Sequence, residues 1–431
     1  MMSGLSHKER IFLLLFIVFV TIFELYHVAI DTNPPMVLRA VYAAIYLVFA
    51  VLSPALIPVY TAINLIVERF SCSFGEFLPN TLLFHIFVLV FGILCLRNKQ
   101  NVRGKAYDYR SFKWFVLLYV YAIVALLLHV NIPSDFSFLI NGAFMLVFLH
   151  FLSISKDKYI QALLRYSVIV MFIVCIIGLF NYESLVGDYS TSLGDVDRLD
   201  WKDANYFSFF IGMMMLFTLY SIKMTKSKNQ RRLYMLGVLL MMVTMAALIS
   251  RGAIVALAIT LIYYYRKELF SLRSLGYLLL VAVAVAGLYY IGILDGLIMR
   301  FMSDDLQTGS GRTELWMVGI KTFFSKDPSV IAFGAGEGQA LKMTYLNGQY
   351  WSPHNNYLSM LYNYGIVGLT IFLIWIGSMF LYFRTRESRA AILFVAVNCM
   401  TIVPFTYVSP VWFVIPLIMI WDKRISGKML Q

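Results

Sequence analysis

Three residues in the second half of the sequence have side chains suited to chemistry on a phosphate-bearing substrate. Arg251, Arg312 and His354 lie at the ends of apolar runs or in the polar stretch between them. An arginine offers a planar, permanently charged fork that can hold phosphate oxygens through two hydrogen bonds. A histidine accepts a proton near neutral pH and can act as general base toward a hydroxyl. Together they could stabilise a phosphate leaving group while a hydroxyl attacks.

Each of the three residues also has an ordinary structural explanation. Arg251, in Ser250-Arg251-Gly252, could reach from a helix end into the lipid headgroup layer, although Gly252 equally lets a ligand come close. Arg312 alone would be a solvated charge on a surface helix. His354 alone would be an interfacial residue before a helix that is capped by Asn355.

The polar, glycine-rich stretch from Gly309 to Leu358 must position Arg312 and His354. It predicts an amphipathic helix from Arg312 to Phe324 at a membrane surface, because one helical face carries Leu315, Trp316, Gly319, Ile320 and Phe323. Asp327 and Pro328 are expected to end this helix. The glycines between 334 and 338 then require backbone freedom that a helix does not allow.

The composition places these elements in a membrane protein. Hydrophobic residues make up 61% of the 431 residues and charged residues only 13%, and the mean hydropathy is +0.78. The net charge of +12 does not indicate nucleic acid, because the basic residues fall between apolar runs. The four cysteines are scattered without metal-ligand spacing, so we assign them no role.

Apolar runs predict an all-α polytopic fold, one integral membrane domain over residues 1–431 with about 12 to 14 transmembrane helices. The runs Met36–Leu52 and Ala55–Val67 meet at Ser53-Pro54 and could form two crossings, a re-entrant pair or one long tilted helix. The last two predicted crossings are Arg389–Tyr407 and Val411–Trp421.

Most lysines and arginines fall in alternate loops, which predicts that both termini are cytoplasmic. Two long loops, 181–203 and 295–354, are then extracytoplasmic. Asp195-Val196-Asp197 in the first loop is interpreted as a solvated turn, and no metal is expected there. Arg165, near the cytoplasmic end of its helix, is interpreted as a charge that reaches toward the headgroups.

The order of several motifs resembles the O-antigen polymerase and O-antigen ligase family. The motifs are Ser-Arg-Gly at 250–252, Gly-Arg-x-x-x-Trp at 311–316, Phe-Gly-x-Gly at 333–336, His-Asn-x-Tyr-Leu at 354–358 and Tyr-Gly-Ile-Val-Gly-Leu at 364–369. Asp203-Ala204-Asn205-Tyr206 is similar to the Asp-Pro-Asn stretch of the family, with alanine in place of proline. The resemblance covers roughly Arg198 to Leu373.

The resemblance implies a membrane glycosyltransferase with a GT-C-like fold, whose large extracytoplasmic loop carries amphipathic helices. Such an enzyme takes a glycan from undecaprenyl pyrophosphate at the outer face of the cytoplasmic membrane, without metal or cofactor. Arg251 and Arg312 would bind the pyrophosphate, and His354 would be the base. Further candidates for substrate contacts are Asn205, Glu314, Trp316, Lys321, Asn355 and Tyr357.

Three functions remain open at this point. The first is polymerisation of lipid-linked repeat units into O-antigen, capsule or exopolysaccharide, and the second is ligation of the same glycan to lipid A core or protein. The third, transport of a lipid or glycan, is disfavoured because transporters place ionisable groups near the bilayer midplane. Expected partners are the glycan donor and acceptor, membrane lipids, and as candidates a chain-length regulator and a flippase; nucleic acid is not expected.

The basic-residue pattern makes a direct topological prediction. Single cysteines introduced within 181–203 and 304–350 should react with an impermeant thiol reagent added outside the cell, whereas cysteines within 99–109 should be protected until the membrane is opened. Labelling of the opposite set would contradict the predicted orientation.

Overall fold

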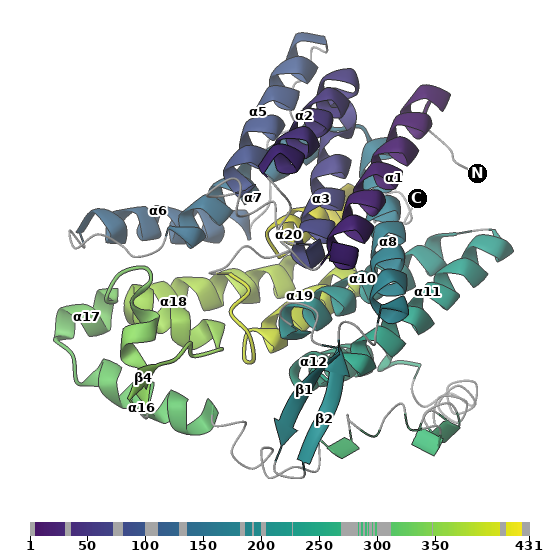
Figure 1. The fold of residues 1–431 in the computed structure, drawn as a ribbon. Helices are drawn as coiled ribbons and strands as arrows, with labels where there is room; N and C mark the ends of the chain where they lie inside the picture. The colour runs from purple at the N-terminus through teal and green to yellow at the C-terminus, as the bar shows by residue number, and fades with distance from the viewer. Residues whose placement is uncertain are drawn as a thin grey trace.

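A computed structural model of the chain shows a bundle of helices with a smaller helical unit at one side (Figure 1). It describes residues 5–30, 36–71, 81–99, 111–128, 136–181, 186–191, 194–199, 204–225, 227–268, 312–346, 348–405 and 411–424, and isolated positions between 283 and 299. The apolar run Leu275–Leu294, which is also predicted to cross the membrane, is described only at isolated positions. Asp304 and Asp305 of the second long loop lie outside the described residues.

The helices in chain order are α1 (His7–Ile30), α2 (Met36–Leu52), α3 (Ile57–Ser71), α5 (Thr81–Lys99), α6 (Phe112–Leu128), α7 (Ser137–Ile154), α8 (Asp157–Phe180), α10 (Ala204–Met224), α11 (Lys228–Ala247), α12 (Arg251–Tyr265), α16 (Arg312–Phe324), α17 (Pro328–Phe333), α18 (Asn356–Tyr382), α19 (Arg386–Asn398) and α20 (Val411–Arg424). Short 3-10 helices are η1 (Pro54–Leu56) and η2 (Gln339–Met343). Two antiparallel hairpins pair β1 (Val186–Thr191) with β2 (Gly194–Leu199) and β3 (Tyr345–Leu346) with β4 (Gln349–Tyr350).

The expectation of an all-α membrane protein is confirmed. Among the described residues, four helices are long and apolar enough to cross a membrane, namely α7, α8, α10 and α18, and the pair α2 and α3 would make a fifth. Large apolar side chains such as Val37, Phe87 and Leu127 are exposed on the outer helices, as expected for surfaces in contact with lipid.

The α2–α3 pair is sharply broken. Its two halves are bent by 113° at Ser53, and Pro54 begins η1 directly after it. A proline ring cannot continue a helix because it removes a backbone donor and clashes with the preceding turn. One long tilted helix is therefore ruled out, and the pair forms a broken span or a re-entrant element.

The first long loop contains a hairpin that the sequence did not predict. Asp195-Val196-Asp197 lies within strand β2, and Asp197 pairs with Asp188 of β1. The interpretation of this segment as a turn was wrong. Adjacent acidic residues obscured the alternation by which a strand is recognised.

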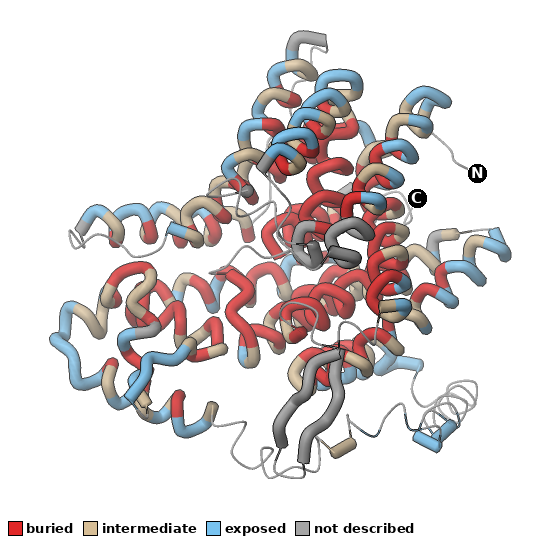
Figure 2. Tube along the Cα trace, viewed as in Figure 1, coloured by how far each residue is buried: buried red, intermediate tan, exposed pale blue. Residues whose placement is uncertain are grey.

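The core is built around α20. From Val411 to Trp421 every residue of α20 is buried, and the middle of the bundle is buried throughout (Figure 2). Trp412 contacts the rings of Phe115, Phe138 and Phe405. A helix that is apolar on all sides is stable only when other elements surround it. Helix α20 is surrounded in this way and packs against α7 and α19.

Helix α18 is interrupted at Gly365, and the glycine loop after α17 fills the gap. Gly365 has φ 68° and ψ −172°, a conformation reserved for glycine. The carbonyls released by the break accept hydrogen bonds from the loop, because Ala335 N donates to Tyr362 O (2.9 Å) and Gly336 N to Asn363 O (3.0 Å). Gly334, with φ 87°, packs directly on the Asn363 backbone. The glycine motifs at 333–336 and 364–369 thus form one contact.

This contact predicts that alanine at Gly334 or Gly365 is strongly destabilising. The backbone conformation alone should cost roughly 1 to 3 kcal/mol, and a methyl group at either position would collide with the opposing backbone. Gly377→Ala is the matched control, because it lies in α18 with open space around it and should be neutral or slightly stabilising. Thermal unfolding in detergent measures the difference, and equal midpoints for all three variants would contradict this account.

Candidate functional site

The predicted amphipathic helix is present with the predicted bounds. Helix α16 runs from Arg312 to Phe324, and its buried stripe consists of Leu315, Gly319 and Phe323. Trp316 is half-buried, whereas Ile320, which was predicted on the buried face, is exposed. Asp327 and Pro328 end α16 as expected, but Pro328 also begins the short helix α17, because proline suits the first helical position.

Helix α16 is held near its start by two hydrogen bonds to other parts of the chain. Arg312 Nη1 donates to the carbonyl oxygen of Thr401 at 3.0 Å. One turn later, Trp316 Nε1 donates to the carbonyl oxygen of Pro353 at 2.7 Å. The first bond reaches the connection between α19 and α20, and the second reaches the residue before His354. The leading turn of α16 is therefore fixed between these two segments.

The connection from Asn398 to Phe405, called here the 398–405 turn, is the centre of the site. A crossing was predicted from Arg389 to Tyr407, and this was wrong: α19 begins at Arg386 and ends at Asn398. Pro404 explains the error, because proline and the residue before it disfavour helix. A turn in apolar surroundings must still satisfy its backbone groups.

Other elements supply the partners that the 398–405 turn needs. Asn356 at the start of α18 donates its N–H to Cys399 O (2.7 Å) and accepts from Phe405 N through its side-chain oxygen (3.1 Å). Tyr206 in the first turn of α10 accepts from Val403 N through its hydroxyl (3.1 Å). Asn356 is fully buried, so removing either contact would leave polar groups buried without partners.

The start of helix α12, which carries Arg251, reaches the same turn. Arg251 is the first residue of α12 and is half-buried. The next residue, Gly252, lies so close to the turn that a side chain there would meet Thr401 Oγ1 at 2.6 Å. Ser250 donates through Oγ to Asn205 Oδ1 at 3.1 Å, which ties α12 to α10. Gly252, the neighbour of Arg251, and the guanidinium of Arg312, 61 positions from Arg251, thus both contact Thr401.

His354 lies at the start of α18 in a backbone conformation that histidine seldom adopts. Its φ is 43°, in the left-handed region, where non-glycine residues are uncommon although Asn, Asp and His occur there more often than other types. Asn355 caps α18, as its Oδ1 accepts from Tyr357 N (3.0 Å) and Leu358 N (3.2 Å). His354 is half-buried, and the bond from Trp316 to Pro353 holds the backbone just before it against the leading turn of α16.

Several predicted substrate-binding residues have structural partners in this arrangement. The Asn355 oxygen caps a helix, Asn205 accepts from Ser250, and Tyr357 donates to the carbonyl oxygen of Ala396 at 2.7 Å. The side chain of Glu337, in the same polar stretch, is buried and accepts from Phe138 N at the start of α7 (2.6 Å). These groups build the site.

Lys321 and Glu314 are not brought to the turn. At about 100° per residue, both lie roughly half a turn around the α16 axis from Arg312, and both are exposed. Their side chains therefore leave the helix on the side away from Thr401. A ligand held by Arg312 could therefore contact Glu314 or Lys321 only if it extended to the solvent side of α16.

Thr401, Asn356 and Tyr206 were missed as organisers of the site. Tyr206 belongs to the Asp203–Tyr206 motif, but the residue of this motif that was predicted to contact substrate is Asn205. Thr401 lies in a run that reads as a transmembrane helix, and Pro404 was the one available signal that this run is broken.

The close approach of Gly252 to Thr401 gives a test of this geometry. Gly252→Ala should destabilise the protein by about 1 to 3 kcal/mol, because the added methyl overpacks the contact. Thr401→Ala removes the nearest atom, Oγ1, so the double variant should regain part of the loss. Thermal unfolding of the four proteins measures the coupling. Additive effects would show that the two residues do not touch.

Comparison with known proteins identifies the segment that carries most of this site. Residues 236–373, which include Arg251, Arg312 and His354, match the family model described as O-Antigen ligase. A comparison with curated proteins found no match. Residues 236–373 are therefore similar to the O-antigen ligase family, and the resemblance to O-antigen polymerases and ligases is confirmed.

Proposed function

We propose that the chain is a membrane glycosyltransferase that polymerises undecaprenyl-pyrophosphate-linked repeat units into a surface polysaccharide, which is an O-antigen, a capsule or an exopolysaccharide. The observation that carries the proposal is that the starts of α12 and α16, which carry Arg251 and Arg312, both meet Thr401. Two arginines at helix starts that meet one turn are well suited to a pyrophosphate, because each guanidinium can hold phosphate oxygens and its charge is permanent.

In this proposal, the two arginines stabilise the leaving group. The bond between the anomeric carbon and the phosphate oxygen breaks, and negative charge grows on the pyrophosphate as it leaves. Interactions that strengthen with that charge accelerate the reaction, because they stabilise the transition state more than the bound substrate. Arg312 donates one hydrogen bond through Nη1 to Thr401 O, which orients its guanidinium relative to the 398–405 turn.

His354 completes the transfer as general base. The acceptor hydroxyl oxygen bonds to the anomeric carbon, and the imidazole takes the hydroxyl proton. The strained backbone at His354 supports this role, because unusual conformations persist where the surrounding structure holds them and cluster at functional sites. Trp316 and Pro353 connect the base to the helix that carries Arg312.

Ligation of the same donor glycan to lipid A core or protein is the second candidate. It is favoured by the description of the matching family model, and it differs from polymerisation only in the acceptor. Transport of a lipid or glycan is disfavoured, because Arg251, Arg312 and His354 lie at the starts of helices and not in the middle of spans.

The proposed orientation places the 398–405 turn at the outer face of the cytoplasmic membrane, with both termini in the cytoplasm. About 12 to 14 crossings of a GT-C-like fold would then leave 181–203 and 295–354 outside. The donor enters from the lipid, and the chain-length regulator and flippase are proposed protein partners.

The arginine roles predict a specific pattern of loss. Arg251→Ala or Arg312→Ala should weaken donor binding by about 1.5 to 3 kcal/mol, and lysine should restore only part because the planar fork is lost. Arg312→Ala also removes the bond to Thr401, so thermal unfolding must be measured alongside binding. Lys326→Ala, on the exposed end of the same unit, is the control. Normal glycan elongation by both alanine variants would reject the assignment.

The histidine role is best tested with His354→Asn, because asparagine tolerates the left-handed backbone better than alanine. Loss of a general base should reduce turnover by about a hundredfold to ten-thousandfold and leave donor binding nearly unchanged. Purified enzyme with lipid-linked donor allows turnover and binding to be measured separately. An unchanged rate would exclude His354 as base, and a rate that falls only in step with binding would make it a phosphate ligand.

A further inference from the structure

Arg165 lines a cavity at the end of the bundle opposite to the 398–405 turn. The cavity has a volume of about 230 Å³ and lies among α8, α10, α11 and α20. Tyr206 is near the start of α10, whereas Ser221 and Thr225 of the cavity are at its end. At about 1.5 Å per residue the two sites are separated by roughly 20 to 30 Å along the helix.

The polar groups of the cavity have unused hydrogen-bond donors. Arg165 and Gln161, on successive turns of α8, and Tyr234 on α11 all line it. Within the described part of the chain, none of these three side chains has a hydrogen bond or an ion pair. The cavity lining contains no acidic side chain. A guanidinium, an amide and a phenol directed to one space form a donor set for an anion.

The hydroxyl groups of Ser221 and Thr225 complete the lining without competing for Arg165. Ser221 Oγ donates to Phe217 O at 2.8 Å, and Thr225 Oγ1 donates to Gln230 Oε1 at 2.9 Å. Their donors are thus already used inside the protein. The charge that an incoming anion meets is therefore that of Arg165.

The cavity also has an apolar wall and a basic entrance. Gln161 is exposed, whereas Tyr234 and Trp421 are buried, so the space runs from the surface to a partly aromatic floor. Residues 221–232, which comprise the end of α10, the connection and the start of α11, include no acidic residue. The basic residues of this segment are Lys223, Lys226, Lys228, Arg231 and Arg232.

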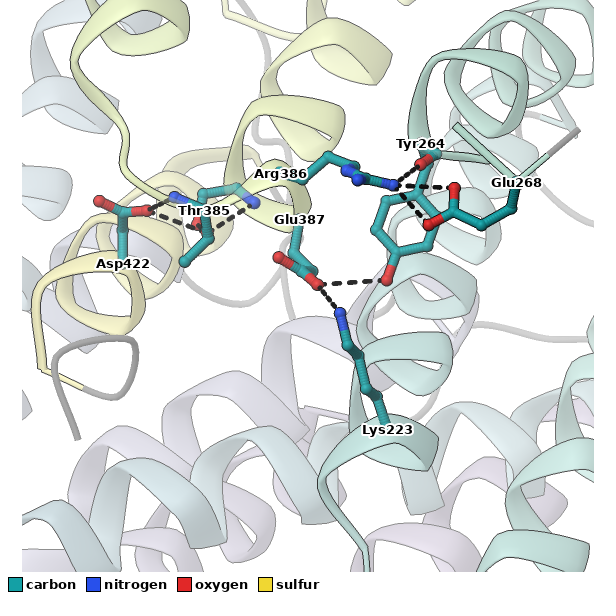
Figure 3. A network of polar contacts seen from close by, with 8 residues as sticks. Lys223, Tyr264, Glu268, Thr385, Arg386, Glu387 and Asp422 are labelled. Carbon is teal, nitrogen blue, oxygen red and sulfur yellow. Dashed lines mark hydrogen bonds and ion pairs between the residues drawn. The ribbon is translucent and has the colours of Figure 1, made fainter. Parts of the chain in front are cut away.

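One of these cations is already engaged elsewhere. Lys223 Nζ contacts Glu387 at 2.8 Å, and Glu387 also accepts from the Tyr264 hydroxyl (Figure 3). Arg231, by contrast, only donates to the Thr225 carbonyl oxygen at 3.4 Å. The basic connection therefore retains positive charge near the cavity, and basic segments next to a membrane attract anionic lipids.

We infer that this cavity binds a phosphate group, with Arg165 as its main ligand and the headgroup of an anionic phospholipid as the favoured source. The apolar wall formed by Leu164 and Trp421 suits the glycerol and first acyl carbons of a lipid. The arginine is then a binding residue and not only a charge that reaches toward the membrane surface. This inference does not depend on the proposed glycosyl transfer.

The test is direct binding to the purified full-length protein in neutral detergent. The probes are dihexanoyl phosphatidic acid, sn-glycerol 3-phosphate, inorganic phosphate and the zwitterionic dihexanoyl phosphatidylcholine, measured by isothermal titration calorimetry. Arg165→Gln should weaken phosphatidic acid binding about tenfold or more, as expected for loss of a charge-assisted contact. Arg266→Gln, the same substitution at an exposed position directly after α12, should change it less than twofold.

The other arms separate the two sources and guard against misfolding. Tighter binding of phosphatidic acid than of glycerol 3-phosphate supports the lipid, and equal binding supports a free phosphate ester in the same site. Tyr234→Phe, which removes one hydroxyl, should weaken binding by a smaller factor without lowering the unfolding temperature. The inference is overturned if Arg165→Gln is folded and binds like the unmodified protein, or if Arg165→Gln and Arg266→Gln lose affinity equally.

Discussion

Backbone polar groups that are released where a helix ends or breaks in apolar surroundings must find partners inside the protein. The two irregular segments of the described second half satisfy this requirement in the same way. At Gly365 the carbonyls of Tyr362 and Asn363 are taken by the glycine loop. At the 398–405 turn, backbone groups are taken by Asn356, Tyr206 and Arg312. In each case the partner comes from a distant part of the chain, and this fixes the tertiary arrangement.

This constraint also explains why the candidate site is where it is. The 398–405 turn lies on the buried helix α20, and the starts of α10, α12, α16 and α18 meet it. Arg251 and Arg312 begin two of those helices, so both residues are brought to the region of this turn by the packing of helix starts before any ligand is considered. The bond from Trp316 to Pro353 then sets the position of His354 relative to α16. A site built on helix starts offers fixed geometry of the kind that transition-state stabilisation requires.

Local signals predicted local structure well. The bounds of α16 followed from its apolar spacing and from Pro328, the helix cap at Asn355 from its side-chain type, and the positive φ angles near 334–338 from the glycines. The errors arose where tertiary contacts decide. Hydropathy alone predicted one helix over residues 389–407, whereas α19 ends at Asn398 and Pro404 lies in the turn that follows. Lys321 and Glu314 lie on the same helix as Arg312 but not on its face of α16. The role of Thr401 rests on contacts with residues far away in sequence, which no local pattern records.

The central claim is that Arg251 and Arg312 hold one pyrophosphate beside Thr401. An experimental structure of the protein with bound undecaprenyl pyrophosphate tests this most directly. The account predicts pyrophosphate density within hydrogen-bonding distance of both guanidinium groups, next to the 398–405 turn and on the same side of α16 as Thr401. A pyrophosphate bound elsewhere, or one that contacts neither arginine, would contradict it.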